Sequence, residues 1–243
     1  GEVRAFHQER REQASDPAVL AAVDAADGVF FTGGHQLQLV STLGGTPLAA
    51  RLHARHREGL HLAGTSAGAS AMSTVMIARG AGRTTARLSA MRMAAGLGFL
   101  PEVIVDQHFR ERDRFGRLFA AVLCNPAMLG FGLDENTAFV LDPDGVVSVC
   151  GSGTLTIVDA AGLEATNIAA IPDDAPAAFA GLRLHALGAG WTFDLSSRRV
   201  DWRVAAIAPP EPVISAGGNV AGASGPEPAR CEASGESSSA GPD

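Results

Sequence analysis

Short apolar runs alternate with longer amphipathic stretches in the first half of the chain, and this alternation limits the fold more than any other feature. The runs 29–31, 60–63 and 103–105 suit buried strands, whereas 47–58 and 110–124 carry apolar residues at helical spacing. Strands and helices that take turns along a chain usually form a mostly parallel sheet flanked by helices. We therefore predict the α/β fold class.

The pattern changes after a further apolar run at residues 129–133. The runs 138–141, 146–150 and 154–158 follow one another closely, and Asp142-Pro143-Asp144-Gly145 between the first two is a typical turn sequence. Closely spaced strands joined by tight turns pair in antiparallel fashion. We expect these runs to form a small antiparallel β extension.

Two segments of different character divide the chain of 243 residues. Residues 1–207 have the apolar content of a folded domain. Residues 208–243 are rich in Pro, Gly, Ser and Ala and have scarcely a large apolar side chain, so they cannot bury enough surface to offset the entropy of ordering. The sequence predicts an α/β domain over 1–207 followed by a disordered tail over 208–243.

Composition excludes several classes of function. The net charge of −7 argues against a duplex-wrapping nucleic-acid binder, and no apolar run approaches the roughly 20 residues that cross a bilayer. Cys124, Cys150 and Cys231 lie far apart, which suggests neither a zinc ribbon nor a disulfide framework. His53 and His56 lack a third metal ligand at a recognisable spacing. We expect no metal, no cofactor, no nucleic acid and no membrane partner, and a cytoplasmic location by default.

A serine flanked by glycines is the first candidate for chemistry. The pattern Gly64-x-Ser66-x-Gly68 lies between the strand-like run 60–63 and small residues 67–75, which we expect to form a helix. A strand-to-helix elbow that presents a nucleophile needs glycines on both sides, because its backbone leaves no room for neighbouring side chains. The alternative is a glycine-lined turn with a buried serine.

A serine hydroxyl needs a base, and His108 is the best placed of the histidines. It ends the apolar strand 103–105 and follows Asp106 and Gln107. The carboxyl ends of parallel strands converge on one crevice, which would bring His108 to Ser66. The alternative is a structural histidine whose hydrogen bonds are satisfied within the fold.

Five further blocks of the sequence are Phe31-Thr32-Gly33-Gly34-x-Gln36-Leu37, Ala63-Gly64-Thr65-Ser66-Ala67-Gly68-Ala69, Gly96-Leu97-Gly98, Val105-Asp106-Gln107-His108-Phe109 and Gly132-Leu133-Asp134-Glu135-Asn136-Thr137. In order and spacing they are similar to the blocks of the cyanophycinases, and the resemblance spans about residues 28–185. With it, the α/β domain over 1–207 is expected to be a hydrolytic one. The resemblance implies a class I glutamine-amidotransferase-like fold. It also implies a serine exopeptidase that cuts cyanophycin, a poly-aspartate backbone with arginines on its side chains, into β-aspartyl-arginine dipeptides. Related members are aspartyl dipeptidases.

The resemblance also assigns roles to individual residues. Ser66 would be the nucleophile and His108 its base, with the backbone N–H groups near Gly34 and Ala67 forming the oxyanion hole. The residues that it places in the substrate pocket are Gln36, Gln107, Arg112, Arg114 and Arg117. Several guanidinium groups suit a substrate rich in carboxylates. The alternative for the arginines is a charged helix face.

The acid of the triad is the main departure from the family pattern. The resemblance implies an acidic residue between the serine and the histidine, where Thr84 stands by register, and no Asp or Glu occurs over residues 66–101. Asp106 and Glu135 are the alternatives that could orient the histidine. The second candidate function is therefore a catalytically impaired homologue that binds acidic or arginine-rich peptides.

The beginning of the chain also differs from the family pattern. The resemblance implies that the first strand and glycine-rich loop of the family's fold are missing ahead of Gly1, so that the chain is N-terminally truncated. We expect a peptide or polymer as substrate. The sequence leaves open whether the chain forms a homodimer.

Overall fold

The structure is a computed structural model that describes residues 1–202. These residues belong to the first of two units into which the chain divides, Gly1–Pro209. The tail predicted over 208–243 lies outside the described residues.

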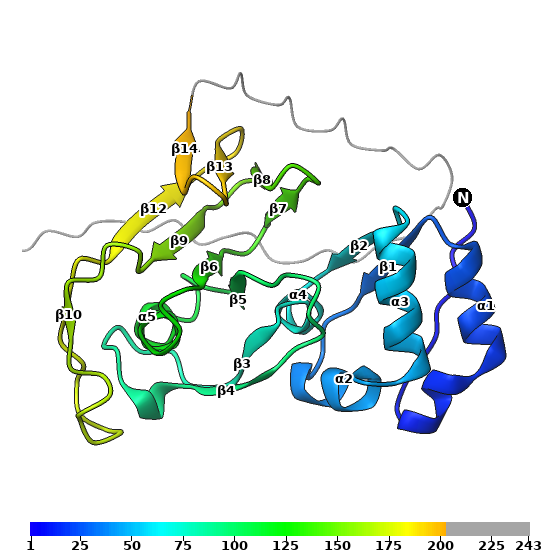
Figure 1. Ribbon diagram of the computed structural model, residues 1–243, viewed down its shortest axis with the longest axis horizontal. Helices are drawn as coiled ribbons and strands as arrows, with labels where there is room; N and C mark the ends of the chain where they lie inside the picture. Colours follow the sequence, from blue (N-terminus) through cyan, green and yellow to red (C-terminus); the bar gives the residue numbers. More distant parts are fainter. Residues whose placement is uncertain (203–243) are drawn as a thin grey trace, which may run out of the picture. The chain divides into compact units, whose positions relative to one another are not determined.

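Helices and strands alternate through the first half of the described chain and give way to strands in the second (Figure 1). The helical elements are η1 Arg11–Ser15, α1 Pro17–Ala25, α2 Gln36–Leu43, α3 Pro47–Arg57, α4 Ala67–Ala71, η2 Leu88–Ala90 and α5 Phe115–Cys124. The strands are β1 Gly28–Phe31, β2 His61–Gly64, β3 Val75–Arg79, β4 Arg92–Ala95, β5 Val103–Gln107, β6 Leu129–Leu133, β7 Thr137–Leu141, β8 Val146–Gly151, β9 Leu155–Asp159, β10 Ala165–Thr166, β11 Phe179–Ala180, β12 Arg183–Leu187, β13 Thr192–Asp194 and β14 Arg199–Asp201. The predicted α/β composition is confirmed.

The N-terminal half is built on the parallel pair β1–β2, in which Phe31 lies opposite Gly64. Helix α1 packs beside α3 (Figure 1). The helix expected over 47–58 is present and ends one residue earlier; Thr46 caps it by accepting a hydrogen bond from the Ala49 N–H at 3.3 Å. Apolar side chains of these helices and strands form one core cluster.

The central sheet has four strands in the order β12-β9-β6-β5. Strands β5 and β6 are parallel, and the other two pairs are antiparallel. Helix α5 lies beside this sheet (Figure 1), and its apolar face packs with Ile104 and Val158 in a second core cluster. Parallel pairing between named strands is thus confined to β1–β2 and β5–β6 in the part of the chain that the structure describes.

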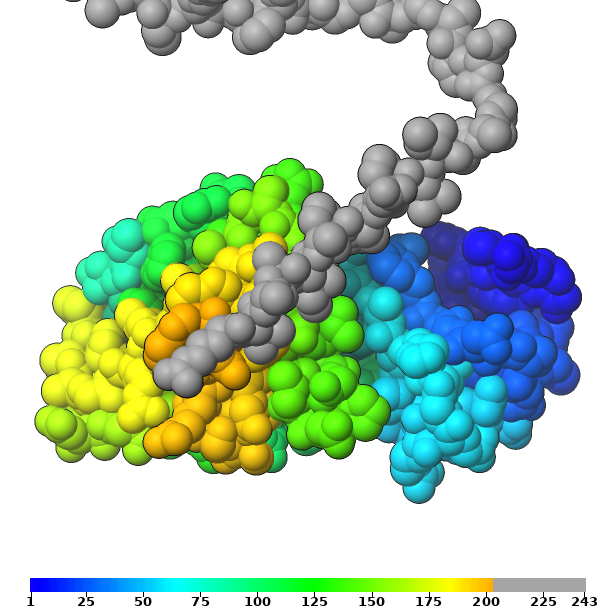
Figure 2. All heavy atoms as spheres, turned by 90° about the horizontal axis from the view of Figure 1, so that it is seen from above, coloured from blue at the N-terminus to red at the C-terminus, as the bar shows by residue number. Residues whose placement is uncertain are grey.

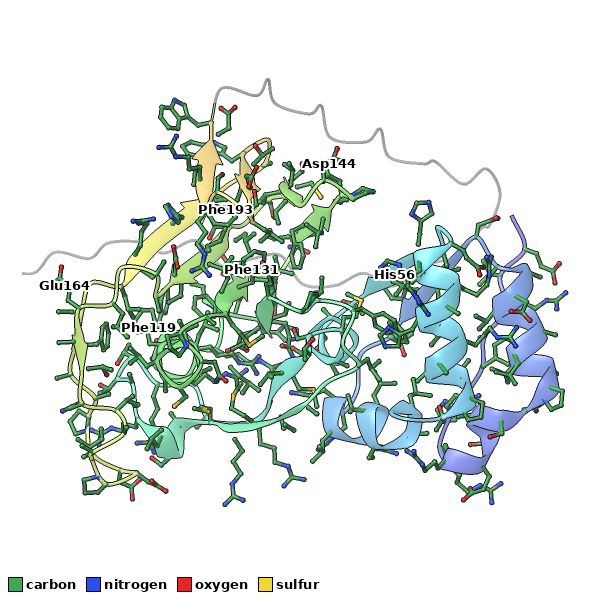
Figure 3. All side chains as sticks on the ribbon, in the orientation of Figure 1. His56, Phe119, Phe131, Asp144, Glu164 and Phe193 are labelled. Atoms are coloured by element: carbon green, nitrogen blue, oxygen red, sulfur yellow. The ribbon has the colours of Figure 1, made fainter. Side chains whose placement is uncertain are left out.

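A second four-stranded sheet, in the order β14-β13-β8-β7, is the predicted antiparallel extension. Its β7–β8 hairpin turns where expected: Asp142 Oδ1 accepts hydrogen bonds from the N–H groups of Asp144 at 3.0 Å and Val146 at 2.8 Å. Phe131 of β6 and Phe193 of β13, both labelled in Figure 3, belong to the cluster that joins the two sheets.

Placing residues 154–158 in that extension was wrong. Strand β9 pairs instead with β6 in the central sheet, with Leu155 opposite Leu133. All five residues of β9 are buried, because core clusters cover both faces of the strand. An apolar run that is covered on both faces belongs inside a sheet.

Two predicted helices are shorter than expected. The helix over 67–75 ends at Ala71, and Val75 begins β3, which pairs with β4. The helix expected from residue 110 begins at Phe115, because Asp113 has a φ of 49°, a left-handed conformation that a right-handed helix cannot contain.

Candidate active site

Ser66 stands at a sharp turn between β2 and α4. Its φ of 50° and ψ of −116° are strained for a residue that is not glycine. A Cβ on Gly68 would collide with the Phe31 carbonyl oxygen, and a Cβ on Gly64 would collide with the backbone of Gly68. The glycines of the predicted elbow are therefore required by close backbone contact.

His108 lies beside the serine, as the strand-end argument predicted. The Nε2 atom of His108 is 3.0 Å from the Oγ atom of Ser66. His108 follows the last residue of β5 directly and has a φ of 47°. The distance is within the range in which a base can accept a hydroxyl proton.

Glu135 holds the other nitrogen of the ring. Its Oε1 atom lies 2.8 Å from His108 Nδ1, and 52% of the Glu135 side chain is exposed against 25% of the His108 side chain. A carboxylate here fixes the tautomer in which Nδ1 carries the proton and Nε2 is free to accept one. Ser66, His108 and Glu135 form a continuous hydrogen-bonded relay.

The assignment of the acid's position to Thr84 was therefore wrong. Thr84 is exposed in the loop between β3 and η2, where the neighbouring Arg83 carbonyl accepts a hydrogen bond from the Gly116 N–H of α5 at 2.7 Å. Thr84 was chosen by its position between the serine and the histidine in the sequence. The residue that contacts the His108 ring, Glu135, instead follows β6 and comes after the histidine.

Sheet register explains why Glu135 reaches His108. In the parallel pair β5–β6, Gln107 lies opposite Leu133, so both chains leave the sheet at the same edge. Asp134, which is buried, then anchors the turn by accepting hydrogen bonds from the Thr154 N–H at 3.1 Å and the Thr154 hydroxyl at 2.8 Å. The backbone N–H of Glu135 donates to Glu111 Oε1 at 3.3 Å.

Asp106, the other alternative for the acid, has a different role. It is fully buried and pairs with two arginines: Arg117 Nε donates to Oδ2 at 2.7 Å, and an Arg114 terminal nitrogen lies 3.3 Å from Oδ1. Burial, opposed by the charge of Asp106, lowers the pKa of Arg114 to about 10, so its guanidinium remains protonated at neutral pH.

Removing the Asp106 charge is expected to destabilise the fold. The change Asp106→Asn leaves two buried guanidinium groups without a counter-charge, and breaking a buried ion pair in this way costs about 3–5 kcal/mol. Asp24→Asn is the matched control, because Asp24 pairs with Arg51 at the surface with 42% of its side chain exposed, and such pairs contribute about 0–1 kcal/mol. Urea unfolding measures both changes; equal losses of unfolding free energy would contradict a structural role for the buried pair.

The structure places one of the two expected oxyanion-hole residues directly after Ser66 and the other next to a glycine that approaches it. A Cβ on Gly33 would lie 3.5 Å from the Ser66 Cβ, which places the Gly33-Gly34 turn against the nucleophile. Ala67 is the first residue of α4, and an N–H in the first turn of a helix has no partner within that helix. The formation of an oxyanion hole by the N–H groups of Gly34 and Ala67 stays a prediction.

The predicted substrate-pocket residues separate into two groups. Gln36 donates from Nε2 to the Ile77 carbonyl at 3.0 Å, and the buried Gln107 contacts the Ser70 hydroxyl. Arg112 is exposed, whereas the Arg114 and Arg117 side chains are only 10% and 4% exposed. The structure brings Arg112 to the surface near His108 and does not bring Arg114 or Arg117 there; substrate contact by all five residues stays a prediction.

Residues 1–202 contain no group of three or more His, Cys, Asp and Glu side chains that could hold a metal ion. None of the helices in this part of the chain is long and apolar enough to cross a membrane.

Comparison with known proteins gives concordant matches. The pattern of Peptidase family S51 matches residues 2–149. The cyanophycinase of Trichormus variabilis is 47% identical over 191 residues, which cover 78% of this chain and 64% of that protein. The cyanophycinase of Synechococcus elongatus is 39% identical over 201 residues, which cover 82% of this chain and 62% of that protein. The chain thus spans less than two thirds of the length of these relatives.

A solved structure shares the fold. The crystal structure of a peptidase from an acI-B1 Actinobacterium superposes with a TM-score of 0.55 at 25% identity, over 76% of this chain and 66% of the other.

Proposed function

This chain belongs to peptidase family S51, and on that premise we propose that it is a serine exopeptidase that hydrolyses cyanophycin to β-aspartyl-arginine dipeptides. The observation that carries the proposal is the relay from Ser66 Oγ through His108 to the Glu135 carboxylate, with separations of 3.0 Å and 2.8 Å. The similarity to proteins named cyanophycinase supports the choice of substrate. We also assign residues 1–207 to the class I glutamine-amidotransferase-like fold, which the elbow at the end of a parallel strand supports.

The first half of the reaction forms an acyl-enzyme. Ser66 Oγ attacks a backbone amide carbonyl of the polymer while its proton moves to His108 Nε2. Glu135 accepts the Nδ1–H bond and stabilises the positive charge that develops on the ring. The N–H groups of Gly34 and Ala67 receive the charge on the carbonyl oxygen. The C–N bond then breaks, and His108 gives its proton to the departing amine.

The second half releases the acid. A water molecule attacks the ester carbon while His108 Nε2 takes one of its protons. The ester bond to Ser66 breaks, the serine oxygen recovers the proton from His108, and the product leaves with a new carboxylate. Arg112 is exposed, and its backbone N–H donates to the His108 carbonyl at 3.2 Å. Its guanidinium group is suited to pairing with substrate carboxylates.

Product analysis tests this proposal. Incubation of the chain with cyanophycin should release β-aspartyl-arginine as the dominant product, measured by liquid chromatography with mass spectrometry. A panel of aspartyl dipeptides in the same assay distinguishes a dipeptidase. Hydrolysis of the dipeptides with no release from the polymer would overturn the assignment to cyanophycin while leaving the relay in place.

The alternative of a silent peptide-binding homologue depended on a missing acid. Glu135 occupies the position beside His108 Nδ1, and no observation favours a role limited to binding. We therefore retain the hydrolase as the proposed function.

A further inference from the structure

A groove of about 600 Å³ is lined by residues of β12 and β14, by Trp191 and Arg198 from the connections on either side of β13, and by Trp202 after β14. Arg183, His185, Trp191, Arg198, Arg199 and Trp202 are among its lining residues. We call it the tryptophan groove. Figure 2 shows this part of the chain, coloured yellow to orange, at the surface seen from above. Neither Ser66 nor His108 lines it.

Both tryptophans of the chain lie in this groove. The ring centroids of Trp191 and Trp202 are 6.5 Å apart with an angle of 36° between the planes, and the two residues are 40% and 60% exposed. Neighbouring large aromatic rings at a surface are typical of binding sites, because a ligand that covers them removes a large apolar area from contact with water. The face of a tryptophan is also the preferred aromatic partner of a guanidinium group.

The charge of the groove is positive. Its lining has three arginines and no acidic residue. Arg183, at 3.7 Å, and Arg198 share one buried carboxylate, that of Asp159, while Arg199 is exposed and has no ion pair with a described residue. The pKa of His185 is lowered, first by burial and then by the positive charge of Arg183. A ligand that carries carboxylates would complement this surface.

The β12 side of the groove belongs to the sheet whose strands β5 and β6 lead to His108 and Glu135. In the order β12-β9-β6-β5, strand β12 lines the groove and β5 leads into His108. Three strand spacings of about 4.8 Å separate these strands by roughly 14 Å. The last residues of β12 and β5 are connected by register across the sheet: Leu187 lies opposite Leu155, and Leu155 lies opposite Leu133. Leu133 in turn lies opposite Gln107, so β12 and β5 end at the same edge of the sheet. An extended peptide of about four or five residues covers this span.

We propose that the tryptophan groove is a second binding site for the polymer, which holds a stretch of chain next to the part cut at Ser66. This inference rests on the proposed function. Cyanophycin carries both groups that the groove would recognise: guanidinium side chains to stack on Trp191 and Trp202, and carboxylates to pair with Arg199 and Arg183. The groove raises the affinity for long chains through added contacts, and it contributes nothing to a substrate too short to span both sites.

Tryptophan fluorescence reports on binding in the groove, because the chain has two tryptophans, both of which line the groove, and no tyrosine. The full chain carrying Ser66→Ala is titrated with soluble cyanophycin and, separately, with the β-aspartyl-arginine dipeptide. We expect a saturable change in emission with the polymer at a concentration of arginine units at which the dipeptide gives none. No change with the polymer, or an equal change with both ligands, would overturn the second site.

Kinetics separate this inference from the proposed function. In the active chain, Trp191→Ala is expected to raise KM for cyanophycin about tenfold and to leave kcat/KM for a dimer of β-aspartyl-arginine unchanged. Arg199→Gln, at an exposed position, should raise the polymer KM in the same selective way. Leu184→Ala is the matched control, since Leu184 lies on β12, is 52% exposed and does not line the groove.

The outcomes are distinguishable. Unchanged polymer KM in both groove variants would contradict the second site while hydrolysis by the unaltered chain still supports the peptidase. If the groove variants lost activity on the β-aspartyl-arginine dimer to the same extent as on the polymer, the second site would likewise be contradicted. The substitutions would then act by disturbing the fold. An unaltered chain that releases no dipeptide would refute the proposed function, and the fluorescence titration would still decide whether the groove binds the polymer.

Discussion

Ser66→Ala is expected to lower kcat for cyanophycin hydrolysis by about 10⁶-fold, since loss of the nucleophile alone removes nearly all catalysis by a serine peptidase triad. The Ser66 Oγ atom, 3.0 Å from His108 Nε2, is the only atom in our scheme that forms a bond to the substrate carbonyl. Stability should change little, because alanine and serine meet the same backbone strain at a φ of 50°. Initial rates of dipeptide release measure the effect.

A serine outside the relay is the control for this variant. Ser89 is exposed within η2, and Ser89→Ala should retain full activity. A Ser66→Ala protein that remains folded and keeps more than about one thousandth of the activity would show that another group attacks the substrate.

Glu135→Gln is expected to lower kcat by about 10³-fold. In a serine protease whose triad acid is buried, the change of acid to amide costs about 10⁴-fold, because the histidine adopts the wrong tautomer. Glu135 is half-exposed, so water can partly replace it and the expected loss is smaller. Thermal unfolding should show little change, since the exposed carboxylate contributes little to stability.

Two variants make this prediction specific. Thr84→Ala should leave kcat unchanged, because Thr84 is exposed in the loop between β3 and η2 and the partner of the His108 ring is Glu135. Glu111→Gln should cost less than about tenfold, since Glu111 contacts the Glu135 backbone N–H and not the ring. A large loss from Thr84→Ala, with no loss from Glu135→Gln, would restore the assignment made from position along the chain.

Sequence patterns predicted the nucleophile and the base because each lies within two residues of the end of a strand. The apolar runs before Ser66 and His108 mark β2 and β5, and glycines that permit close contact mark the elbow. Glu135 could only be named as an alternative. Its contact with His108 depends on the register of β5 against β6 and on the turn anchored by Asp134, neither of which leaves a periodic pattern in the sequence.

The backbone conformation around the active site could not be predicted from the sequence. Ser66, His108 and Asn136, the residue after Glu135, all have positive φ angles, at 50°, 47° and 52°. Such conformations are unfavourable for side chains other than glycine, and the surrounding packing must impose them. The residue types at these positions do not indicate a positive φ angle, so the turns that carry the relay could not be predicted from backbone propensities.

For Arg114 and Arg117, the sequence suggested a role that the structure does not support. Arg114 and Arg117 resembled pocket residues in the sequence, yet their guanidinium groups pair with the buried Asp106. A carboxylate in a strand whose residues are all buried needs buried partners, which the sequence could have indicated. The β12–β14 region was not predicted, because these strands are short and only partly buried.

The central claim is that Glu135 and His108 activate Ser66, and labelling by a fluorophosphonate tests it without reference to any substrate. We expect one covalent adduct per chain, located on Ser66 by peptide mass spectrometry, forming far more slowly in Glu135→Gln and at an unchanged rate in Thr84→Ala. An adduct on a different residue, no adduct at all, or a labelling rate that does not respond to Glu135→Gln would contradict the relay.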